Sequence, residues 1–229
     1  MNGTFMYASE IKSLLRHPDF VKELNAEALK PYMTFQYPAI GETFFKGVYK
    51  LPEGHYFTYR DGKMDIHRYY DEDFREGKQK LGELVNSIDQ TVCDSVKAHQ
   101  IADVEVGSFL SSGVDSSYVA AVARPQHTYS IGFGKGTYNE SQQAGELAEL
   151  LKLNNTAESL TDEEAFAAFP RIQWHLDEPD SNPSCVPLYF LSALAAKDVK
   201  VVLSGEGATS CSPDTSTTAC TPNSGPSRW

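Results

Sequence analysis

The sequence predicts an α/β fold with a doubly wound parallel sheet, preceded by a smaller unit that mixes helices and strands. From Leu81 onward, apolar β-branched runs alternate with stretches of helical periodicity, which is the pattern of a parallel sheet flanked by helices. Before residue 72 the chain instead favours short helices and a hairpin. With 229 residues, 41% hydrophobic and 22% charged, it has the length and composition of one large or two small globular domains.

The first domain, residues 1–72, is predicted to be a small α+β unit. A cap at Asn25 can begin a helix that continues to Phe35. The other predicted elements are a strand at Phe5–Tyr7, a helix at Glu10–Leu15, and a hairpin with strands at His55–Tyr59 and Met64–Tyr69 around an Asp61–Gly62 turn. The charged segment 71–80 is predicted to be a linker.

The second domain, residues 73–208, begins with a long helix in which apolar residues recur every three or four positions from Leu81 to Val96. Strands are predicted at Val104–Leu110, Tyr129–Phe133, Asn155–Leu160 and Val199–Leu203. Helices are predicted between them at Asp115–Ala123, Glu140–Leu151, Asp162–Leu176 and Pro187–Ala196. This alternation predicts the doubly wound sheet.

Charge and hydropathy exclude several classes of partner. The net charge of −11 disfavours nucleic acid and anionic membranes, which are recognised through a positive field. The longest apolar stretch, Val186–Ala196, is well short of the ~20 residues that cross a bilayer. Because no secretory signal is visible and the four cysteines lack metal-ligand spacing, we expect a cytoplasmic protein with reduced thiols.

A loop of small residues follows the first strand of the sheet domain. Its sequence, Ser111-Ser112-Gly113-Val114-Asp115-Ser116, leads directly into a helix. In such a turn, backbone amides and the helix N-terminus point at one spot and form a site for phosphate, and an acidic side chain at the rim can hold Mg²⁺. The same residues are equally compatible with an ordinary strand-to-helix loop capped by Asp115 or Ser116.

A second loop, Ser204-Gly205-Glu206-Gly207, also follows a predicted strand. Ligands of open α/β sheets lie beyond the carboxyl ends of the strands, so both loops can face one crevice. A glutamate between two glycines is well placed to reach a ligand, although a solvent-exposed turn remains the alternative. Ser130–Phe133 lies at the end of a third predicted strand and could contribute to the same site. A purely structural role at the edge of the core is the stronger interpretation of this segment.

These segments resemble a known family. Leu110–Ser117 is similar to the PP-loop of the Rossmann-like ATP pyrophosphatases, whose usual form is Ser-Gly-Gly-x-Asp-Ser. Leu203–Ala208 and Trp174–Pro179 narrow the resemblance to glutamine-dependent asparagine synthetases. Three N-terminal segments resemble the end of that family's Ntn-type glutaminase domain: Tyr7–Leu15, Phe45–Val48 and Leu51–His55. The resemblance extends from residue 5 to residue 208.

The resemblance implies a two-step reaction. ATP adenylates the side-chain carboxylate of aspartate and releases pyrophosphate, and ammonia derived from glutamine then displaces AMP. On matching positions, pyrophosphate would be bound by Ser111, Gly113, Asp115 and Ser116, with Asp115 as a ligand of the cofactor Mg²⁺. The nucleotide would be contacted by Phe109 or Leu110, Ile131, Ser204 and Gly205, and Glu206 would be required to form the acyl-adenylate. For the full-length protein, the resemblance allows a homodimer.

Three departures from the family pattern limit what we expect of this chain. Ser112 replaces the first motif glycine, which a serine tolerates only outside glycine-only backbone conformations. Asn2 follows Met1 where the family's glutaminase exposes a nucleophilic cysteine, and most of that domain is missing, so glutamine hydrolysis is expected to fail. Thr209 follows Ala208 where the family has an aspartate that binds a second Mg²⁺.

The last segment, residues 209–229, is predicted to be disordered. Thr, Ser and Pro make up 13 of its 21 residues, and it contains no Val, Ile, Leu, Met or Phe. If one G is restored before the codon of Thr209, the following codons can encode Asp-Glu-Leu-Phe-Ala-Gly-Tyr, which matches the family's continuation. We hypothesise that a one-base deletion, natural or from sequencing, put this tail out of frame, which the coding DNA would test.

The sequence therefore predicts a fragment of an asparagine synthetase with impaired activity. One alternative is a non-catalytic ATP-binding remnant. Another is a different PP-loop adenylating enzyme, such as a β-lactam synthetase-like protein. Asp177 and Glu178, which precede Pro179, are compatible with a solvated turn or with a role in the site.

Overall fold

The computed structural model describes residues 4–71, 79–133 and 140–207. The chain divides into two compact units. The N-terminal unit comprises residues 1–78 and 167–186, and the sheet unit comprises residues 79–166 and 187–229. The sequence treats 73–208 as one domain, whereas the structure groups 167–186 with the N-terminal residues.

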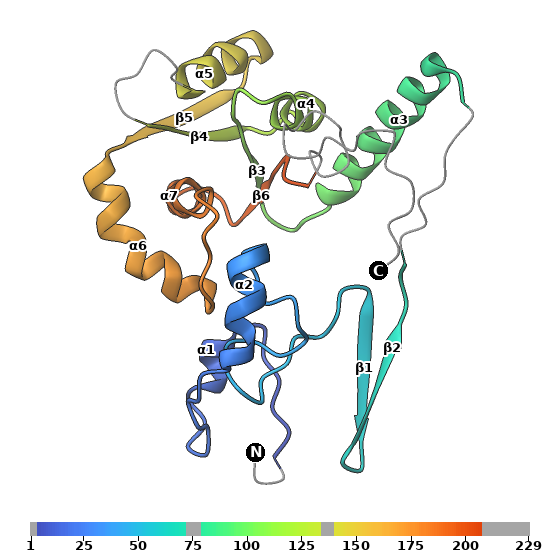
Figure 1. Ribbon diagram of the computed structural model, residues 1–229. Helices are drawn as coiled ribbons and strands as arrows, with labels where there is room; N and C mark the ends of the chain where they lie inside the picture. Colours follow the sequence, from blue (N-terminus) through green and yellow to red (C-terminus); the bar gives the residue numbers. More distant parts are fainter. Residues whose placement is uncertain (1–3, 72–78, 134–139, 208–229) are drawn as a thin grey trace. The chain divides into compact units, whose positions relative to one another are not determined.

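The sheet unit is built on four parallel strands in the order β5-β4-β3-β6 (Figure 1). Their bounds are Val106–Phe109 for β3, His127–Phe133 for β4, Asn154–Leu160 for β5 and Val201–Leu203 for β6. The chain begins in the interior with β3, moves outward through β4 to β5, and returns to the other side of β3 as β6. The strand order therefore reverses between β3 and β6, and the doubly wound parallel sheet predicted from the sequence is confirmed.

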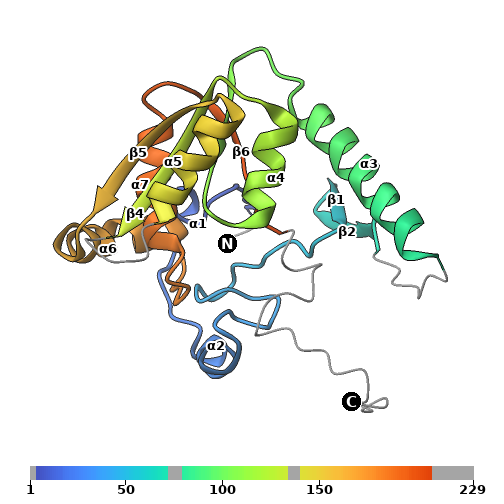
Figure 2. The same cartoon turned by 90° about the horizontal axis from the view of Figure 1, so that it is seen from above.

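Helices cover both faces of this sheet (Figure 2). The elements are α3 (Leu81–His99), α4 (Val114–Ala123), α5 (Glu140–Leu151) and α7 (Cys185–Ala195). One face is packed by α4 and α5, whose alanines form a buried cluster with Leu110. The other face is packed by α7, whose Leu194 and Ala195 pack with Val199 against Tyr129. Because side chains alternate between the faces of a strand, neighbouring residues such as Phe109 and Leu110 enter different clusters.

The N-terminal unit contains short elements and one hairpin. They are α1 (Ile11–Leu14), a 3₁₀ turn η1 (Ala26–Ala28), α2 (Leu29–Phe35), β1 (His55–Arg60) and β2 (Lys63–Arg68). Asn25 caps the 3₁₀ turn by accepting a hydrogen bond from the Glu27 amide, as predicted. Asp61 and Gly62 both have positive φ angles, 50° and 76°, so the two-residue turn fits the twist of the hairpin.

The predicted strand at Phe5–Tyr7 is wrong. Residues 4–8 form no strand. Phe5 stacks on Tyr59 with ring centroids 4.3 Å apart, and Tyr7 packs edge-on against Phe57. Aromatic residues here supply ring contacts to the hairpin instead of ladder hydrogen bonds. The other predicted elements within the described residues are confirmed with boundaries shifted by a few residues. The predicted linker residues 72–78 and the tail 209–229 lie outside the described residues.

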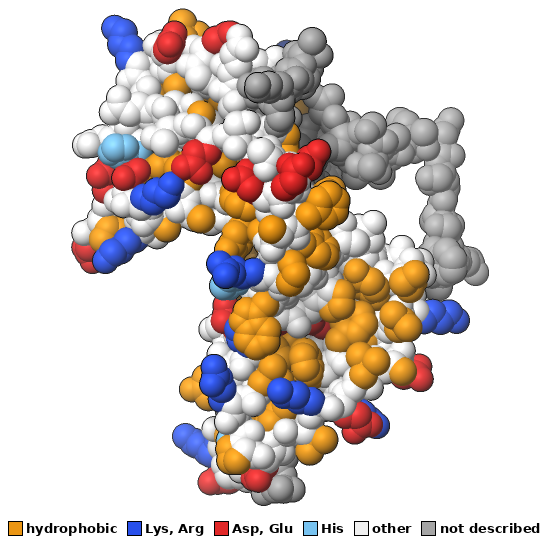
Figure 3. Space-filling model, turned by 90° about the vertical axis from the view of Figure 1, so that its left-hand side faces the viewer, with side chains coloured by type: hydrophobic (Ala, Val, Ile, Leu, Met, Phe, Trp, Pro, Cys, Tyr) orange, Lys and Arg blue, Asp and Glu red, His pale blue; other side chains and the backbone are white. Residues whose placement is uncertain are grey.

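The remaining helix, α6 (Asp162–Leu176), begins among residues of the sheet unit and ends among residues of the N-terminal unit. Hydrophobic side chains also gather on the exposed surface of the N-terminal unit, in the lower part of the space-filling view (Figure 3). Leu29, Met33 and Tyr37 of this unit are each more than half exposed. Across the described ranges, no helix combines the length and the hydropathy that crossing a membrane requires.

Candidate active site

The two serine and glycine loops lie at the point where the strand order reverses. The first loop follows β3 and the second follows β6, and these strands are paired in parallel register with Ser108 opposite Leu203. Parallel neighbours end at the same edge of a sheet, so both loops emerge side by side. In doubly wound sheets this switch point is the place where the backbone opens a crevice for a ligand.

The loops are in close contact. A Cβ atom placed on Gly205 would lie 2.6 Å from the amide nitrogen of Ser116 and 2.9 Å from the carbonyl carbon of Asp115. Real Cβ atoms do not approach backbone so closely, so only glycine fits at position 205 with this backbone. The prediction that the two loops meet at one edge of the sheet is therefore confirmed.

Hydroxyl groups hold the first loop in shape. The Oγ atoms of Ser111 and Ser116 are 2.7 Å apart, and the Ser111 amide donates to Ser116 Oγ over 3.2 Å. Ser111 Oγ also accepts from the Gly113 amide over 3.1 Å, and Ser117 Oγ donates to the Gly113 carbonyl over 2.6 Å. These hydrogen bonds fix the conformation of the loop at the start of α4.

The start of α4 leaves amide donors free of helical partners. Gly113 is the N-cap residue and supplies no side-chain cap, and the first amides of an α-helix have no acceptor within the helix. Asp115 lies in this first turn and is partly buried. An anion is favoured at this position by the amides and by the helix dipole.

Ser112 fits the loop without strain. It is not among the described non-glycine residues that have positive φ angles, and Gly113 itself has a φ of −73°. The replacement of the first motif glycine by serine is therefore compatible with this backbone.

The second loop is short and open. The Glu206 amide donates to Ser204 Oγ over 3.1 Å, which folds the chain back after β6. Gly207 follows with a φ of 89°, a conformation that glycine adopts readily. The Glu206 side chain is exposed.

The middle of β4 anchors Leu110, the residue that precedes the first loop. Leu110, 2% exposed, donates its amide to the Tyr129 carbonyl and accepts from Ser130 Oγ over 2.7 Å. Asn155 Oδ1 accepts from both Ser130 and Thr128 hydroxyls. Sequence reasoning singled out the Ser130 segment but missed this anchoring role, for which the only signal was a run of hydroxyl residues in a buried strand.

The other predicted site residues divide into two groups. Ser111, Gly113, Asp115 and Ser116 lie together in the first loop and are joined by Gly205 of the second. Phe109 and Ile131 lie instead in strands, where both pack against the cluster beneath α7. Any nucleotide contact from these two positions would come from the backbone.

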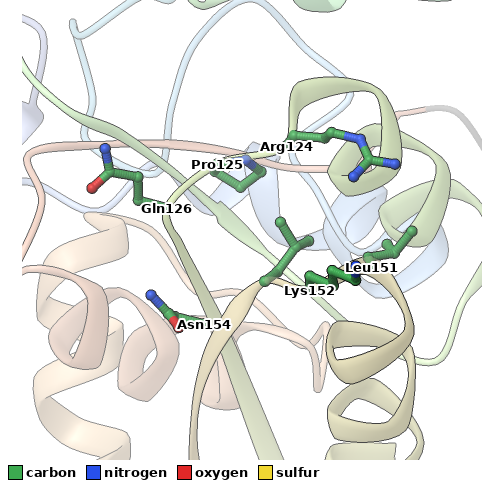
Figure 4. Close-up of a pocket in the computed structure, with 7 residues that line it drawn as sticks. Arg124, Pro125, Gln126, Leu151, Lys152 and Asn154 are labelled. Atoms are coloured by element: carbon green, nitrogen blue, oxygen red, sulfur yellow. The ribbon is translucent and has the colours of Figure 1, made fainter.

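A surface pocket lies elsewhere on the sheet unit. It is lined by residues at the beginnings of β4 and β5 and at the ends of α4 and α5, among them Arg124, Gln126, Lys152 and Asn154 (Figure 4). These are the amino ends of the strands, opposite the carboxyl ends that carry the two loops. The pocket is therefore separate from the candidate active site.

Family models match both parts of the chain. The asparagine synthase model matches residues 87–210, just over half of the chain, and the glutamine amidotransferase domain model matches residues 1–70. The first match contains both loops of the candidate site.

Individual proteins show the same relationship. Asparagine synthetase [glutamine-hydrolyzing] 1 of Bacillus subtilis is 38% identical over 213 residues, which cover 91% of this chain and 34% of that protein. Asparagine synthetase [glutamine-hydrolyzing] 3 of the same organism is 29% identical over 143 residues, 57% of this chain and 23% of that protein. The chain therefore spans about one third or less of the length of these relatives.

Among solved structures, the NH₃-dependent NAD synthetase of Campylobacter jejuni aligns with a TM-score of 0.37 and 18% identity, covering 51% of this chain and 54% of that one. The family match over residues 87–210 does not depend on this partial alignment. The chain belongs to the asparagine synthase family.

Proposed function

We propose that the sheet unit forms an acyl-adenylate on the side chain of aspartate and passes it to ammonia. A carboxylate oxygen of aspartate attacks the α-phosphorus of ATP, the α–β anhydride bond breaks, and pyrophosphate leaves. The nitrogen of ammonia then attacks the acyl carbon, AMP leaves with the bonding electron pair, and the nitrogen gives up a proton to yield asparagine. The observation that carries this proposal is the close approach of Gly205 to Ser116 at the switch point.

The first loop would hold the phosphates. The amides at the start of α4 and the hydroxyls of Ser111 and Ser116 offer several donors to one anion. Binding there orients the leaving pyrophosphate, and orientation together with electrostatic stabilisation supplies most of the catalysis at a phosphorus centre. Phe109 or Leu110, Ile131, Ser204 and Gly205 would contact the nucleotide through their backbone.

The first loop also offers an oxygen ligand of the kind that a magnesium ion prefers. Mg²⁺ prefers oxygen ligands and is usually held by one or two carboxylates together with substrate phosphates and water. Asp115 supplies one carboxylate in the turn where phosphate would bind, so it is the residue that would hold the ion. When bound, Mg²⁺ neutralises phosphate charge.

Glu206 would act on the aspartate side of the reaction. This role is supported by its exposed side chain and by its place in the sequence directly after Gly205, which lies against the backbone of Ser116. We propose that it positions the reacting groups for adenylate formation.

The decisive assay is pyrophosphate release from Mg·ATP with aspartate and ammonium, compared with glutamine as the nitrogen donor. Release that requires aspartate, together with asparagine formed from ammonium, is the expected result. E206Q should lose release while retaining ATP binding, and E163Q, a change in the first turn of α6, is the matched control. Release supported by another carboxylic acid but not by aspartate would reassign the substrate.

A second candidate function is ATP binding without catalysis. It is favoured by Thr209, which stands where the family has an aspartate ligand for a second Mg²⁺. With less neutralised phosphate charge, adenylate formation would be slowed even if the nucleotide binds. ATP binding measured by calorimetry, with no pyrophosphate release for any substrate, would support this function in place of the first.

A further inference from the structure

The turn after α6 makes its polar contacts within the N-terminal unit. Residues 167–186, which we call the strap, comprise the later part of α6, the turn that follows it and the start of α7, and they are grouped with residues 1–78. Both ends of the strap continue into residues of the sheet unit. The candidate active site uses none of the strap's polar side chains.

Asp177 caps a helix that has no cap of its own. Glu10 precedes α1 and makes no side-chain cap, and the amides of Ile11 and Lys12 instead donate to the two carboxylate oxygens of Asp177 over 2.7 and 3.2 Å. Ile11 and Asp177 are 166 residues apart in the sequence. Asp177 has a φ of 65°, so the chain turns sharply after Leu176 and presents the carboxylate to α1.

Lys12 adds charge to this contact. Its ammonium group lies 2.8 Å from Asp177 Oδ1 and donates to the His175 carbonyl over 3.1 Å. The hydrogen bond to Asp177 is the largest of the interactions that raise the pKa of Lys12 above its ordinary value. The N-terminus of α1 is therefore held by both carboxylate oxygens and by a neighbouring ion pair.

Glu178 makes the same kind of contact with a different segment. Its side chain is 9% exposed, one oxygen accepts from the Phe44 amide over 3.0 Å, and the other pairs with Lys50. Together, the four carboxylate oxygens of Asp177 and Glu178 have donors from residues 11–50. A carboxylate is buried at low cost only when it is paired in this way. The structure therefore excludes the solvated turn that the sequence left open.

We propose that the strap is a docking element through which the synthase-like part of the chain binds its own glutaminase-like part. The strap's carboxylates are bound by backbone amides at residues 11–12 and at Phe44, and by the ammonium groups of Lys12 and Lys50. Because these donors come from separate segments, the contact depends on the folded shape of the N-terminal unit. Because the strap continues into α7 and then β6, it ties the N-terminal unit to the stretch of chain that leads to Glu206. This inference does not depend on the adenylation chemistry.

Cutting the covalent connection tests whether the strap holds the two parts together. A protease recognition sequence inserted between Gly77 and Lys78 allows the folded full chain to be cleaved there. D177N/E178Q keeps the size of both side chains but removes their charge. E164Q is the matched control, because Glu164 also accepts from a backbone amide, that of Thr161, but lies in α6 outside the strap.

After cleavage, the two fragments of the wild type and of E164Q should stay together in size-exclusion chromatography. For D177N/E178Q, the dissociation constant of the two fragments should be at least about tenfold higher than for the wild type, because charge-assisted hydrogen bonds are lost. The variant fragments should therefore already elute separately at concentrations where the wild-type fragments still elute together. Wild-type fragments that separate as readily as those of the variant would overturn the proposal. Variant fragments that remain together on the same dilution as the wild type would also overturn it.

Amide hydrogen exchange of the uncleaved chain gives a second measurement. In D177N/E178Q the amides of Ile11, Lys12 and Phe44 should exchange at least about tenfold faster than in the wild type. The Leu110 amide, bonded to Tyr129 in the sheet, should exchange as before. Unchanged exchange at the three amides contradicts docking, and equal acceleration at Leu110 would show that the carboxylates serve general folding instead.

Discussion

Gly205 is a residue at which one added methyl group should disturb both loops of the candidate site. A Cβ there would overlap the backbone of Asp115 and Ser116, so G205A must push the loops apart. Overpacking of this kind costs about 1–3 kcal/mol, and we expect ATP affinity measured by calorimetry to fall by a corresponding factor of about 5 to 150.

The matched control for G205A is G145A. Gly145 lies inside α5, and a Cβ there meets nothing within 4 Å. Alanine favours a helix interior over glycine by about 1 kcal/mol, so G145A should stabilise the chain and leave ATP affinity unchanged. Equal ATP affinity in G205A and G145A would show that the loops do not share a ligand.

Tyr129 should make the stability of the chain sensitive to alkaline pH. Burial, with a smaller effect of Asp198, raises the pKa of Tyr129 to about 12. The unfolded tyrosine ionises near its ordinary value of 10.0, so its contribution to stability is complete below pH 10 and is lost as the pH rises to 12.

Y129F should remove this part of the pH dependence. The urea denaturation midpoint of the wild type should fall more steeply between pH 10 and 12 than that of Y129F. The difference in slope is at most one proton, about 1.4 kcal/mol per pH unit. Parallel curves for the two proteins would contradict the assignment to Tyr129.

Among individual residues, the sequence could predict those whose role follows from a strand ending at a known edge. Ser111, Ser116 and Gly205 were placed together because each follows a parallel strand. The partners of Asp177 and Glu178 could not be predicted, since backbone amides more than 100 residues away leave no mark in side-chain patterning.

At the scale of elements, α6 owes its start to a reciprocal cap. The Thr161 amide donates to Glu164 Oε2 over 2.9 Å, and the Glu164 amide donates to Thr161 Oγ1 over 3.2 Å. T161A should destabilise the chain by about 1 kcal/mol in urea denaturation. T156A, a change in β5, removes a hydroxyl that is not part of this cap and serves as the comparison. Equal effects of the two changes would contradict the capping role.

The contribution of this cap to the stability of the chain should also decrease at acidic pH. Hydrogen bonds from the backbone and then the side chain of Thr161 lower the pKa of Glu164 below its ordinary value of 4.5. Its contribution is therefore complete above pH 4.5 and is lost as the pH falls through the lowered value. In E164Q, thermal denaturation between pH 3 and 5 should vary less with pH than in the wild type, and identical profiles would refute this source of acid sensitivity.

Elements with a clear period were predicted well, and the one without was not. The helices α5 and α6 have the bounds expected from the sequence, because helical periodicity is a property of the local sequence. Phe5–Tyr7 has the composition of a strand but no partner strand, and its rings pack on the hairpin instead. Composition indicates a preference for extended backbone, and strand pairing depends on the rest of the fold.

At the scale of the whole molecule, the boundary between units differs from the boundary in the sequence. A synthase-like segment runs from residue 87 to 210, yet residues 167–186 fold with the N-terminal unit. Periodicity distinguishes helix from strand but not which unit a helix joins, so this exchange was not visible in the sequence. The N-terminal unit therefore combines residues matched by the glutamine amidotransferase domain model with residues matched by the asparagine synthase model.

The central claim is that the loops after β3 and β6 bind one nucleotide between them. Amide hydrogen exchange during a titration with Mg·ATP tests it most directly. We predict that residues 111–117 and residues 204–207 become protected together, at the same ATP concentration, while the strap does not change. Protection of only one loop, or of neither at concentrations where ATP is bound, would contradict the claim.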